Sequence, residues 1–329
     1  MRFSVQAILL TGTGAPDVLV ASEVPTPQPS PDEILLRAEA IPVLFPETML
    51  RSGAFPMPVE FPIVFGTQAA GVITEVGVGV DTALLGQRVI VSSNTFGTYA
   101  EQVSVPAALA TPIPDGLSTV DAAAVGMSAS VAIPLLETAE LTGTETILIE
   151  AAATGVGAYL TQLAKEYGAA RVIATAGGTE KAEQARGFGA DVVIDHLDPE
   201  WPRQLRETLG GATLDVVFDS LGGESALALL DLMTPLRGRM LSYGFLSGAP
   251  AQVSAMDLIM RGLTLIGCSG PDWLAGVAQA RGAALKRAAT GSITPLVDRV
   301  LPLEQAAYAH QLLAERAAKG TIVLRPGRA

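Results

Sequence analysis

The sequence predicts an α/β protein in which a β-rich first part is followed by a doubly wound parallel sheet. Strand-like runs bounded by glycine and proline fill residues 5–106, and from residue 119 short apolar runs alternate with amphipathic segments. Strands that alternate with helices form parallel sheets, because each helix covers the sheet on its way to the next strand. The clearest unit of this kind spans residues 144–189.

The first part of the chain is predicted to form a small barrel-like sheet. Its strand-like runs are QAILL, VLVASEV, EILLRAEAI, FGTQAAGVITEVGVGV, GQRVIVSS and GTYAEQVSVP. The glycines that interrupt the valine-rich run at 65–80 indicate tight turns or bulges. Two other segments are not strands: ETMLRSG at 47–53 is predicted to form one or two helical turns, and TPIPDGLS at 111–118 a boundary loop.

The second part alternates between helix and strand. Residues 120–141 are predicted to be mostly helical with a break at Pro134, because proline removes a helix hydrogen bond. The strands and helices predicted to follow are strands 146–150, 171–175, 191–195, 214–220, 238–244 and 263–269, and helices 156–167, 179–187, about 199–209 and SALALLDLM. The tail adds predicted helices at 274–290 and 303–319 and strands at 298–301 and TIVLRP.

Composition limits the classes of function. Hydrophobic residues make up 49% of the 329 residues, enough for a large core, but no uninterrupted run has the length of a membrane span. A net charge of −12 argues against nucleic acid, which is bound mainly through lysine and arginine. One cysteine and two histidines exclude an internal disulfide and a four-cysteine zinc site, and make a catalytic zinc very unfavourable. We therefore expect a soluble, cytoplasmic protein without a metal.

The turn AAATGVG at 151–157 is the candidate phosphate site. It joins the apolar run TILIE to an amphipathic helix, whose first N–H groups have no partner inside the helix and attract an anion. In the dinucleotide fingerprint G-x-G-x-x-G, however, Ala152 and Thr154 replace the first two glycines, and only Gly157 is present. The turn alone also fits an ordinary buried βαβ unit without a ligand.

The order of these segments resembles the medium-chain dehydrogenase/reductase family, and within it the zinc-free quinone oxidoreductase and zeta-crystallin group. The matching segments, which span nearly the whole chain, are LRSGAFP, FGTQAAGVITEVG, GTYAEQVSVP, PIPDGLSTVDAAAV, AAATGVG, TAGGTEKAEQARGFGADVVID, LDVVFDSLGGE, GRMLSYG and AHQLLAERAAKGTIVLRP. The zinc branch carries a His-Glu pair where Thr67 and Gln68 stand here.

The resemblance implies a fold, a cofactor and an assembly. A β-rich GroES-like catalytic domain would comprise residues 1–118 and 266–329, and a Rossmann dinucleotide-binding domain residues 119–265. Such proteins are NADPH-dependent reductases that pass a hydride to an activated carbon of a quinone, enone or enoyl compound. The family commonly forms homodimers through an edge strand of the cofactor domain, here LTLIGCS.

The residues after the second strand of the cofactor domain predict NADPH rather than NADH. An acid there would hydrogen-bond the ribose 2′-OH and repel a 2′-phosphate, but ATAGGTEK has none before Glu180. Lys181 is the candidate phosphate partner, with Thr175 and Thr179 as hydroxyl donors; the alternative for Lys181 is a solvated helix lysine. The full set of predicted cofactor-binding residues is Ser130, Thr154, Gly155, Val156, Thr175, Lys181, His196, Ser220, Leu221, Tyr243, Gly244, Phe245 and Lys319.

Several members of this set depend on the resemblance. Ser130 matches a threonine near the nicotinamide amide, His196 a tyrosine near the adenine ribose, and Lys319 a position near the cleft in relatives. His196 is as readily an exposed loop residue, and Lys319 a charge at a helix end. The residues of the set at 220–221 and 243–245 follow later strands, on the side of the sheet where ligands bind.

The catalytic candidates are Glu47 and Thr67. Glu47 stands where many relatives have Asp, and Thr67 is the nearest hydroxyl; a helix cap or salt bridge is the favoured alternative for Glu47, and Thr67 is expected to line the cleft. Leu44 and Met49 replace the Asn and Tyr of related reductases, which favours a hydrophobic acceptor and a proton taken from solvent. Two other reactive side chains, Tyr99 and Cys268, are expected to be buried and inert.

We therefore expect a zinc-independent, NADPH-dependent reductase of activated C=C bonds. Its substrate would be a small hydrophobic unsaturated carbonyl compound, and its partner a second copy of the chain rather than nucleic acid or membrane. An enoyl-thioester reductase of fatty-acid or polyketide metabolism is a second possibility, although no basic cluster for a carrier phosphate is evident. An NADPH-binding sensor with little catalysis is a third, because the usual Asn and Tyr are missing.

Overall fold

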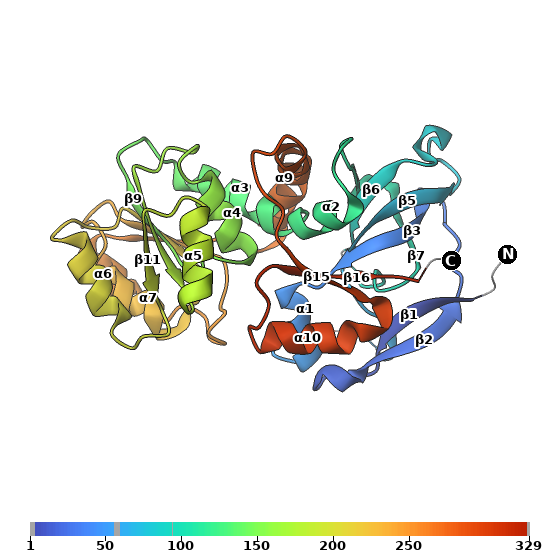
Figure 1. Cartoon of the computed structure of the whole chain (residues 1–329), viewed down its shortest axis with the longest axis horizontal. Coiled ribbons are helices and arrows are strands. Elements are labelled where there is room, and N and C mark those ends of the chain that lie inside the picture. Colours follow the sequence, from blue (N-terminus) through green and yellow to red (C-terminus); the bar gives the residue numbers. More distant parts are fainter. Residues whose placement is uncertain (1–3, 56–59, 94, 328–329) are drawn as a thin grey trace. The chain divides into compact units, whose positions relative to one another are not determined.

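The computed structural model describes residues 4–55, 60–93 and 95–327 and divides into two compact units (Figure 1). The first unit takes in the described parts of Met1–Gly126 and Gly282–Ala329, and the second is Met127–Arg281. Helix α9 (Pro271–Ala289) contributes residues to both. We describe each unit separately.

The first unit contains two sheets. A three-stranded sheet has the order β2-β1-β4, and a seven-stranded sheet has the order β15-β16-β3-β5-β6-β8, with β7 also paired to β3. The strands are β1 (Ser4–Leu10), β2 (Leu19–Pro25), β3 (Glu33–Pro42), β4 (Ile63–Val64), β5 (Gln68–Val76), β6 (Arg88–Ser92), β7 (Gln102–Pro106), β8 (Ala110–Pro112), β15 (Val297–Pro302) and β16 (Thr321–Arg325). The strand β16 pairs with β3 through Val323 and Leu324, so strands far apart in the sequence are neighbours in the seven-stranded sheet.

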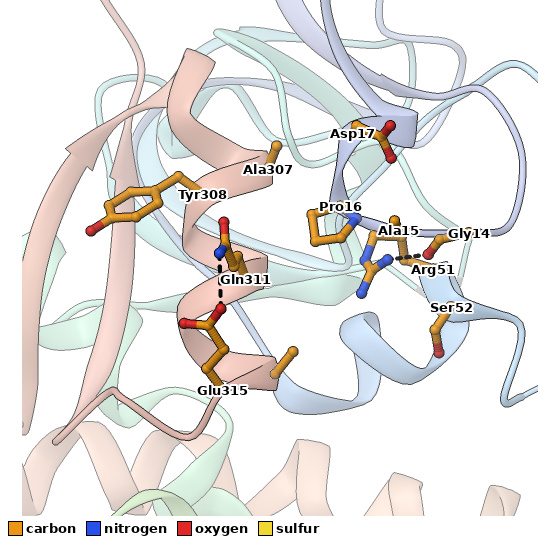
Figure 2. A pocket seen from close by; sticks show the side chains of 11 residues that line it. Gly14, Ala15, Pro16, Asp17, Arg51, Ser52, Ala307, Tyr308, Gln311 and Glu315 are labelled. Carbon is orange, nitrogen blue, oxygen red and sulfur yellow. Dashed lines mark hydrogen bonds between the residues drawn. The ribbon is translucent and has the colours of Figure 1, made fainter.

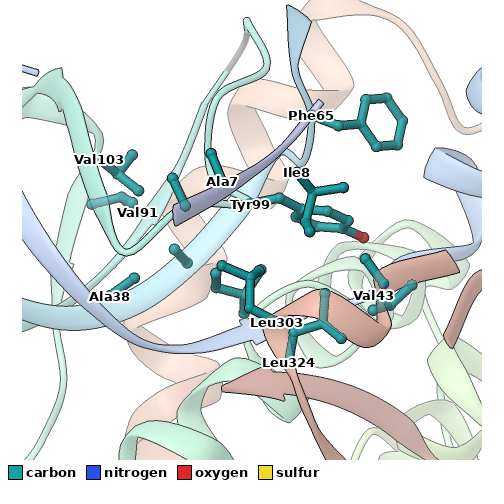
Figure 3. Packing of buried hydrophobic residues seen from close by; sticks show 14 of the residues in the cluster. Ala7, Ile8, Ala38, Val43, Phe65, Val91, Tyr99, Val103, Leu303 and Leu324 are labelled. Atoms are coloured by element: carbon teal, nitrogen blue, oxygen red, sulfur yellow. The ribbon is translucent and has the colours of Figure 1, made fainter. Parts of the chain in front are cut away.

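Helices and a mixed aliphatic and aromatic core complete the first unit. The helices are α1 (Phe45–Ser52), α2 (Thr119–Val125), α10 (Ala306–Ala314) and the short η1 (Pro16–Val18), η2 (Thr82–Leu84), η3 (Ala107–Leu109) and η4 (Leu303–Gln305). Figure 3 shows Ile8, Tyr99 and Leu324 packed in this core. The glycine pattern predicted turns or bulges, and the pairing of β5 with β3 shifts register between Leu35 and Leu36 and between Ala38 and Ala40. Gly71 also allows close approach, because a Cβ there would lie 2.0 Å from the Arg37 carbonyl oxygen of β3.

The second unit is a six-stranded parallel sheet of order β11-β10-β9-β12-β13-β14. The strands are β9 (Thr146–Ile149), β10 (Arg171–Ala176), β11 (Val192–Asp195), β12 (Val216–Asp219), β13 (Arg239–Ser242) and β14 (Thr264–Gly267). The helices are α3 (Ser128–Ala139), α4 (Gly155–Leu163), α5 (Thr179–Gly187), α6 (Trp201–Leu209), α7 (Gly223–Leu230) and α8 (Ala255–Arg261). In Figure 1 the strands lie between α6 and α7 on one side and α3 and α4 on the other.

This strand order confirms the predicted doubly wound fold. The order along the sheet reverses between β9 and β12, and in such sheets a ligand binds outside the carboxyl ends of the strands at this switch point. All six predicted strands of this part of the chain are present within two residues of their predicted bounds. Continuous apolar runs identify them because parallel strands are covered on both faces.

The unit boundaries lie at 126/127 and 281/282, not at the expected 118/119 and 265/266. Helix α2 packs on β3, β5, β6, β15 and β16, so it belongs with the first unit. The expected boundary after residue 265 falls inside β14, which pairs with β13 as far as Gly267. The helical stretch is also interrupted elsewhere than predicted: α3 continues through Pro134, and the break lies at Gly126 and Met127.

Two other predicted elements are shorter than expected. Within the predicted strand 97–106 only β7 pairs regularly, and the predicted helix 303–319 consists of η4 and α10, which ends at Ala314.

One helical stretch among the described residues, Thr119–Ala139, is long and apolar enough to cross a membrane by length and composition. It consists of α2 and α3, and 61% of its most apolar window is buried inside the structure. Core helices meet the same criterion, and the packing of α2 on five strands accounts for the apolar composition of that helix.

Candidate cofactor and active site

The turn between β9 and α4 is tight and presents helix amides. Thr154 is the N-cap, with extended backbone, and Gly155 follows with φ +53°, a left-handed value that suits glycine. A Cβ on Gly155 would meet no atom within 4 Å, so its surface is open. The first amides of α4 have no partner within the helix, and this nine-residue helix directs them and its dipole toward this open side. The turn can therefore hold an anionic group such as a pyrophosphate.

Gly157 allows the turn to pack against its own helix. A Cβ on Gly157 would lie 2.5 Å from the carbonyl oxygen of Ala151 and 3.0 Å from Cα of Ala152. Ala151 itself has φ +49°, an unusual value for a residue with a side chain. Gly157, the third glycine of the fingerprint, is thus required, because a side chain there would clash with the backbone of the turn. The turn forms with Ala152 and Thr154 in place of the first two glycines.

Thr175 at the end of β10 organises its surroundings through its hydroxyl. The Ala151 amide donates to Thr175 Oγ1 at 3.2 Å, and His196 Nδ1 lies 3.1 Å from the same oxygen. Because this side chain is buried, it orients the phosphate turn and His196 rather than offering a hydroxyl to a ligand. Lys181 lies half-buried in the first turn of α5, so its position is compatible with a phosphate contact.

Asp195 is a neighbour that the sequence reasoning did not consider. Its Oδ1 accepts hydrogen bonds from the amides of Gly178, at 3.0 Å, and Leu197, at 2.9 Å. These bonds lower the pKa of Asp195 below its usual range, so it is ionised. The segment after β10 has no acid before Glu180, but Asp195 of the neighbouring strand β11, which pairs with Ala176, brings a carboxylate to the same edge of the sheet.

The segments after β12 and β13 run side by side. The Leu246 amide donates to the Ser220 carbonyl at 2.9 Å, and the Ser247 amide to the Leu221 carbonyl at 2.9 Å. A Cβ on Gly244 would lie 3.0 Å from the Ser220 carbonyl oxygen, which explains the glycine there. Tyr243 and Phe245 flank Gly244, and all three are half-buried. These predicted residues therefore gather at the same carboxyl edge of the sheet as Thr154, Gly155 and Val156.

The remaining predicted residues lie elsewhere in the two units. Ser130 is buried in α3 of the second unit. Lys319, Glu47 and Thr67 belong to the first unit, and the Lys319 amide donates to Asp298 Oδ1 at 3.3 Å. Cys268 is buried, and burial raises its pKa to about 11, so its thiol is inert as expected.

Glu47 is the centre of a buried hydrogen-bond network in the first unit. Its Oε2 accepts from the Leu44 amide at 2.9 Å and the Tyr99 hydroxyl at 2.7 Å, and its Oε1 accepts from the amide and hydroxyl of Thr67, both at 2.8 Å. The Leu44 contact caps the start of α1, which is the alternative weighed against catalysis in the sequence. With 1% of its surface exposed, the carboxylate has no face open to a substrate.

His310 extends this network in a way that the sequence did not reveal. Its Nε2 lies 3.0 Å from the Tyr99 hydroxyl oxygen. Since that hydroxyl donates its one hydrogen to Glu47, the His310 Nε2–H donates to it in turn. Burial lowers the pKa of His310 to about 3, so the ring is neutral. Burial also raises the pKa of Glu47, against the four hydrogen bonds that favour its ionised form.

A separate pocket of about 750 Å³ lies in the first unit between η1, α1 and α10 (Figure 2). Arg51 is its buried cation and donates to the Gly14 carbonyl, while Gln311 donates to Glu315 across one turn of α10 at 2.8 Å. Asp17 and Glu315 bring negative charge to the same lining. The pocket contains none of the predicted site residues. Within the described part of the chain, no three His, Cys, Asp or Glu side chains are grouped so as to hold a metal.

Comparison with known proteins places these features in a family. The description "alcohol dehydrogenase GroES-like domain" fits residues 30–115, and "zinc-binding dehydrogenase" fits residues 155–286. Quinone oxidoreductase 1 of Escherichia coli is 33% identical over 323 residues, which cover 95% of this chain and 97% of that protein. The chain belongs to the zinc-free quinone oxidoreductase group of the medium-chain dehydrogenase/reductases.

Another relative and a solved structure match the chain over a similar length. A 2-haloacrylate reductase of a Burkholderia species is 32% identical, over 98% of this chain and 99% of its own. The crystal structure of E. coli quinone oxidoreductase in complex with NADPH superposes with a TM-score of 0.89 and 32% identity, covering 98% of this chain and all of that one. The GroES-like and Rossmann assignments are thereby confirmed.

Proposed function

We propose that this protein is a zinc-independent, NADPH-dependent oxidoreductase that transfers a hydride to the activated C=C bond of a quinone, enone or related α,β-unsaturated carbonyl compound. The observation that carries the proposal is the carboxyl edge of the six-stranded sheet, where a glycine-containing turn presents the first amides of α4 at the switch point. Relatives named quinone oxidoreductase and 2-haloacrylate reductase support a substrate with a conjugated C=C bond.

The residues at this edge fit a dinucleotide phosphate. The amides of Gly155 and Val156 would hold the pyrophosphate, and Lys181 the 2′-phosphate, with His196 beside the adenine ribose. The segments 220–221 and 243–245, with Ser130 and Lys319, would hold the nicotinamide half. When bound, NADPH supplies the hydride, and the protein residues hold and orient it.

The first unit would supply the acceptor site. We infer that Glu47 is a positioning residue, because its carboxylate is saturated by four donors and fixes both the amide and the hydroxyl of Thr67. The Thr67 hydroxyl hydrogen is committed to Glu47, so Thr67 would contact substrate as a hydrogen-bond acceptor or through its methyl group. Apolar Leu44 and Met49 favour a hydrophobic acceptor, and solvent would supply the proton that completes the reduction.

The cofactor assignment predicts a tighter complex with NADPH than with NADH. Replacing Lys181 by alanine should raise the Kd for NADPH about tenfold, the usual size of one charge-assisted phosphate contact, and leave the Kd for NADH unchanged. Fluorescence titration with both cofactors measures this. Arg186→Ala, at the exposed far end of the same helix, is the matched control. If the unaltered protein bound NADH as tightly as NADPH, Lys181 would not contact the 2′-phosphate, and Asp195 would be assigned the contact with the ribose hydroxyl.

A substrate panel distinguishes the three candidate functions. Loss of NADPH absorbance is followed with quinones, enones, 2-haloacrylates and enoyl-CoA. We expect turnover with quinones or enones. Efficient turnover of enoyl-CoA alone would favour the enoyl-thioester reductase, and NADPH binding without turnover of any acceptor would favour a sensor.

We also propose a cytoplasmic homodimer. β14 is an edge strand of the parallel sheet, and it leaves backbone groups unpaired on one side. Large apolar side chains that precede it are exposed: Leu236, Met256, Ile259 and Met260. Pairing of two β14 strands would cover these groups. Light scattering that gives the mass of a single chain would contradict the dimer.

A further inference from the structure

Two buried carboxyl groups stand next to each other at the switch point of the parallel sheet. Glu150 follows the last residue of β9, and Asp219 is the last residue of β12. The two strands are paired up to Phe218 and Ile149, so the two acidic residues come level with each other. Neither side chain is exposed to solvent.

Together these groups hold the turn that follows β12. Glu150 Oε2 accepts from the amides of Ser220, at 3.2 Å, and Leu221, at 3.3 Å, and its Oε1 accepts from the Ser225 hydroxyl at 3.2 Å. Asp219 Oδ1 accepts from the Gly222 amide at 2.7 Å. The turn 220–222 and the start of α7 are therefore fixed by side chains from two strands.

Asp219 also fixes the end of β13. Its Oδ2 accepts from the Ser242 hydroxyl at 2.7 Å, directly before Tyr243. The pair thus lies beneath both segments to which we assign the nicotinamide half of NADPH.

The surroundings of the pair do not tolerate two negative charges. The titratable groups that interact with it are the Tyr243 hydroxyl and, through that residue, the Cys268 thiol, both acids; the causes that shift the pKa of Glu150 include no lysine or arginine. Burial first, and the charge of Asp219 second, raise the pKa of Glu150 well above its usual range, and the two carboxyl groups share a hydrogen bond. Glu150 is accordingly a neutral acid that donates to Asp219.

We propose that Glu150 is a positioning residue for the cofactor, which in its neutral form, bonded to Asp219, sets the Ser220–Leu221 turn for NADPH. Loss of the shared proton places two adjacent charges in the core, which separates the side chains and disturbs the turn. The added charge also lies close to the turn that receives the cofactor's phosphates. NADPH affinity therefore falls as the pair ionises. This inference rests on the proposed binding of NADPH at this edge of the sheet.

The first test is the Kd for NADPH of the unaltered protein between pH 7 and 9, where the 2′-phosphate is already fully ionised. We expect the Kd to rise toward alkaline pH, because loss of the Glu150 proton leaves two adjacent negative charges beneath the turn; each tenfold rise in Kd would correspond to one pKa unit of coupling between the pair and NADPH. In Glu150→Gln the amide still accepts from the turn and donates to Asp219 but cannot ionise. Its Kd should stay within about threefold of the unaltered protein at pH 7 and remain flat to pH 9.

Glu150→Ala and a matched control complete the design. The alanine variant leaves the turn amides without their acceptor, so its Kd should be about tenfold weaker at pH 7. Asp215→Asn alters a carboxyl group at the opposite end of β12, where it accepts from the Thr146 amide at 2.9 Å and the Thr234 hydroxyl at 2.7 Å. This control is expected to lower Tm and to leave the Kd for NADPH and its pH profile unchanged.

Different outcomes would contradict the proposed binding of NADPH and the proposed role of Glu150. If the unaltered protein does not bind NADPH at any pH, the proposed function is wrong. If it binds NADPH with a Kd that is constant from pH 7 to 9, or if Glu150→Gln keeps the pH dependence, the role of Glu150 is wrong. The first of these measurements needs no variant, so poor folding of a mutant does not remove the test.

Discussion

Glu47→Ala is expected to destabilise the protein by about 4 kcal/mol or more, which is a large share of the stability of a typical domain. The reason is that four donors lose their acceptor at once: the Leu44 amide, the Thr67 amide and hydroxyl, and the Tyr99 hydroxyl. Each buried donor left unpaired costs roughly 1–3 kcal/mol. Denaturant unfolding monitored by circular dichroism measures the loss.

A graded series separates the loss of hydrogen bonds from the loss of charge. Glu47→Gln keeps one acceptor oxygen but turns an amide NH₂ toward two donors, so it should lose about 2–4 kcal/mol. Glu23→Ala is the control, because Glu23 accepts from Ser4 and Gln6 on the exposed surface of the same unit and should change stability by less than about 0.5 kcal/mol. If Glu47→Ala were as stable as the control, the network would be filled by water and our account of Glu47 would fail.

Gly157→Ala is expected to weaken NADPH binding about 30-fold and to lower stability by about 1–3 kcal/mol. The added Cβ would lie 2.5 Å from the Ala151 carbonyl oxygen and 2.9 Å from its carbon. Both contacts are with backbone, so the phosphate turn itself must shift away from α4. Calorimetric titration with NADPH and thermal unfolding measure the two effects.

Gly187→Ala is the matched control for this substitution. Gly187 is the last residue of α5 in the same unit, its φ is not positive, and an added Cβ there meets no atom within 4 Å. Alanine in a helix is favoured over glycine by about 1 kcal/mol, so this variant should be as stable as the parent or more so. Unchanged NADPH affinity in Gly157→Ala would show that the turn does not carry the pyrophosphate.

The parallel sheet could be predicted closely because its signal is local. Each of its strands is a continuous apolar run with a helix-forming segment behind it, which is enough to predict a parallel, doubly wound sheet. The order of the strands came only from the structure. The break in the helical stretch after residue 119 was misplaced because packing decides it. A Cβ on Gly126 would lie 2.2 Å from Ile90 Cδ1, whereas Pro134 costs α3 one hydrogen bond and is tolerated.

The candidate site could be predicted only where its residues are close in sequence. The network of Glu47, Tyr99 and His310 joins positions 52 and 211 residues apart, and no pattern in the chain connects them. Tyr99 is a core residue, as its sequence context predicted. Its buried hydroxyl is also bonded to Glu47 and His310, which the sequence context did not indicate. Thr175 was expected to donate to a phosphate, and only the structure shows that its hydroxyl is buried, accepts from the Ala151 amide and lies 3.1 Å from His196 Nδ1.

The pairing of β16 with β3 constrains the order in which the chain can be completed during synthesis. The first unit lacks β15, α10 and β16 until residues 297–325 have been made. Before then, Tyr99 has no His310 to contact and β3 has no β16 to pair with. The second unit, by contrast, has all six strands once Gly267 has been added. The second unit lies in the sequence between the two segments of the first unit. Its core can therefore fold while the sheet of the first unit still lacks its last strands.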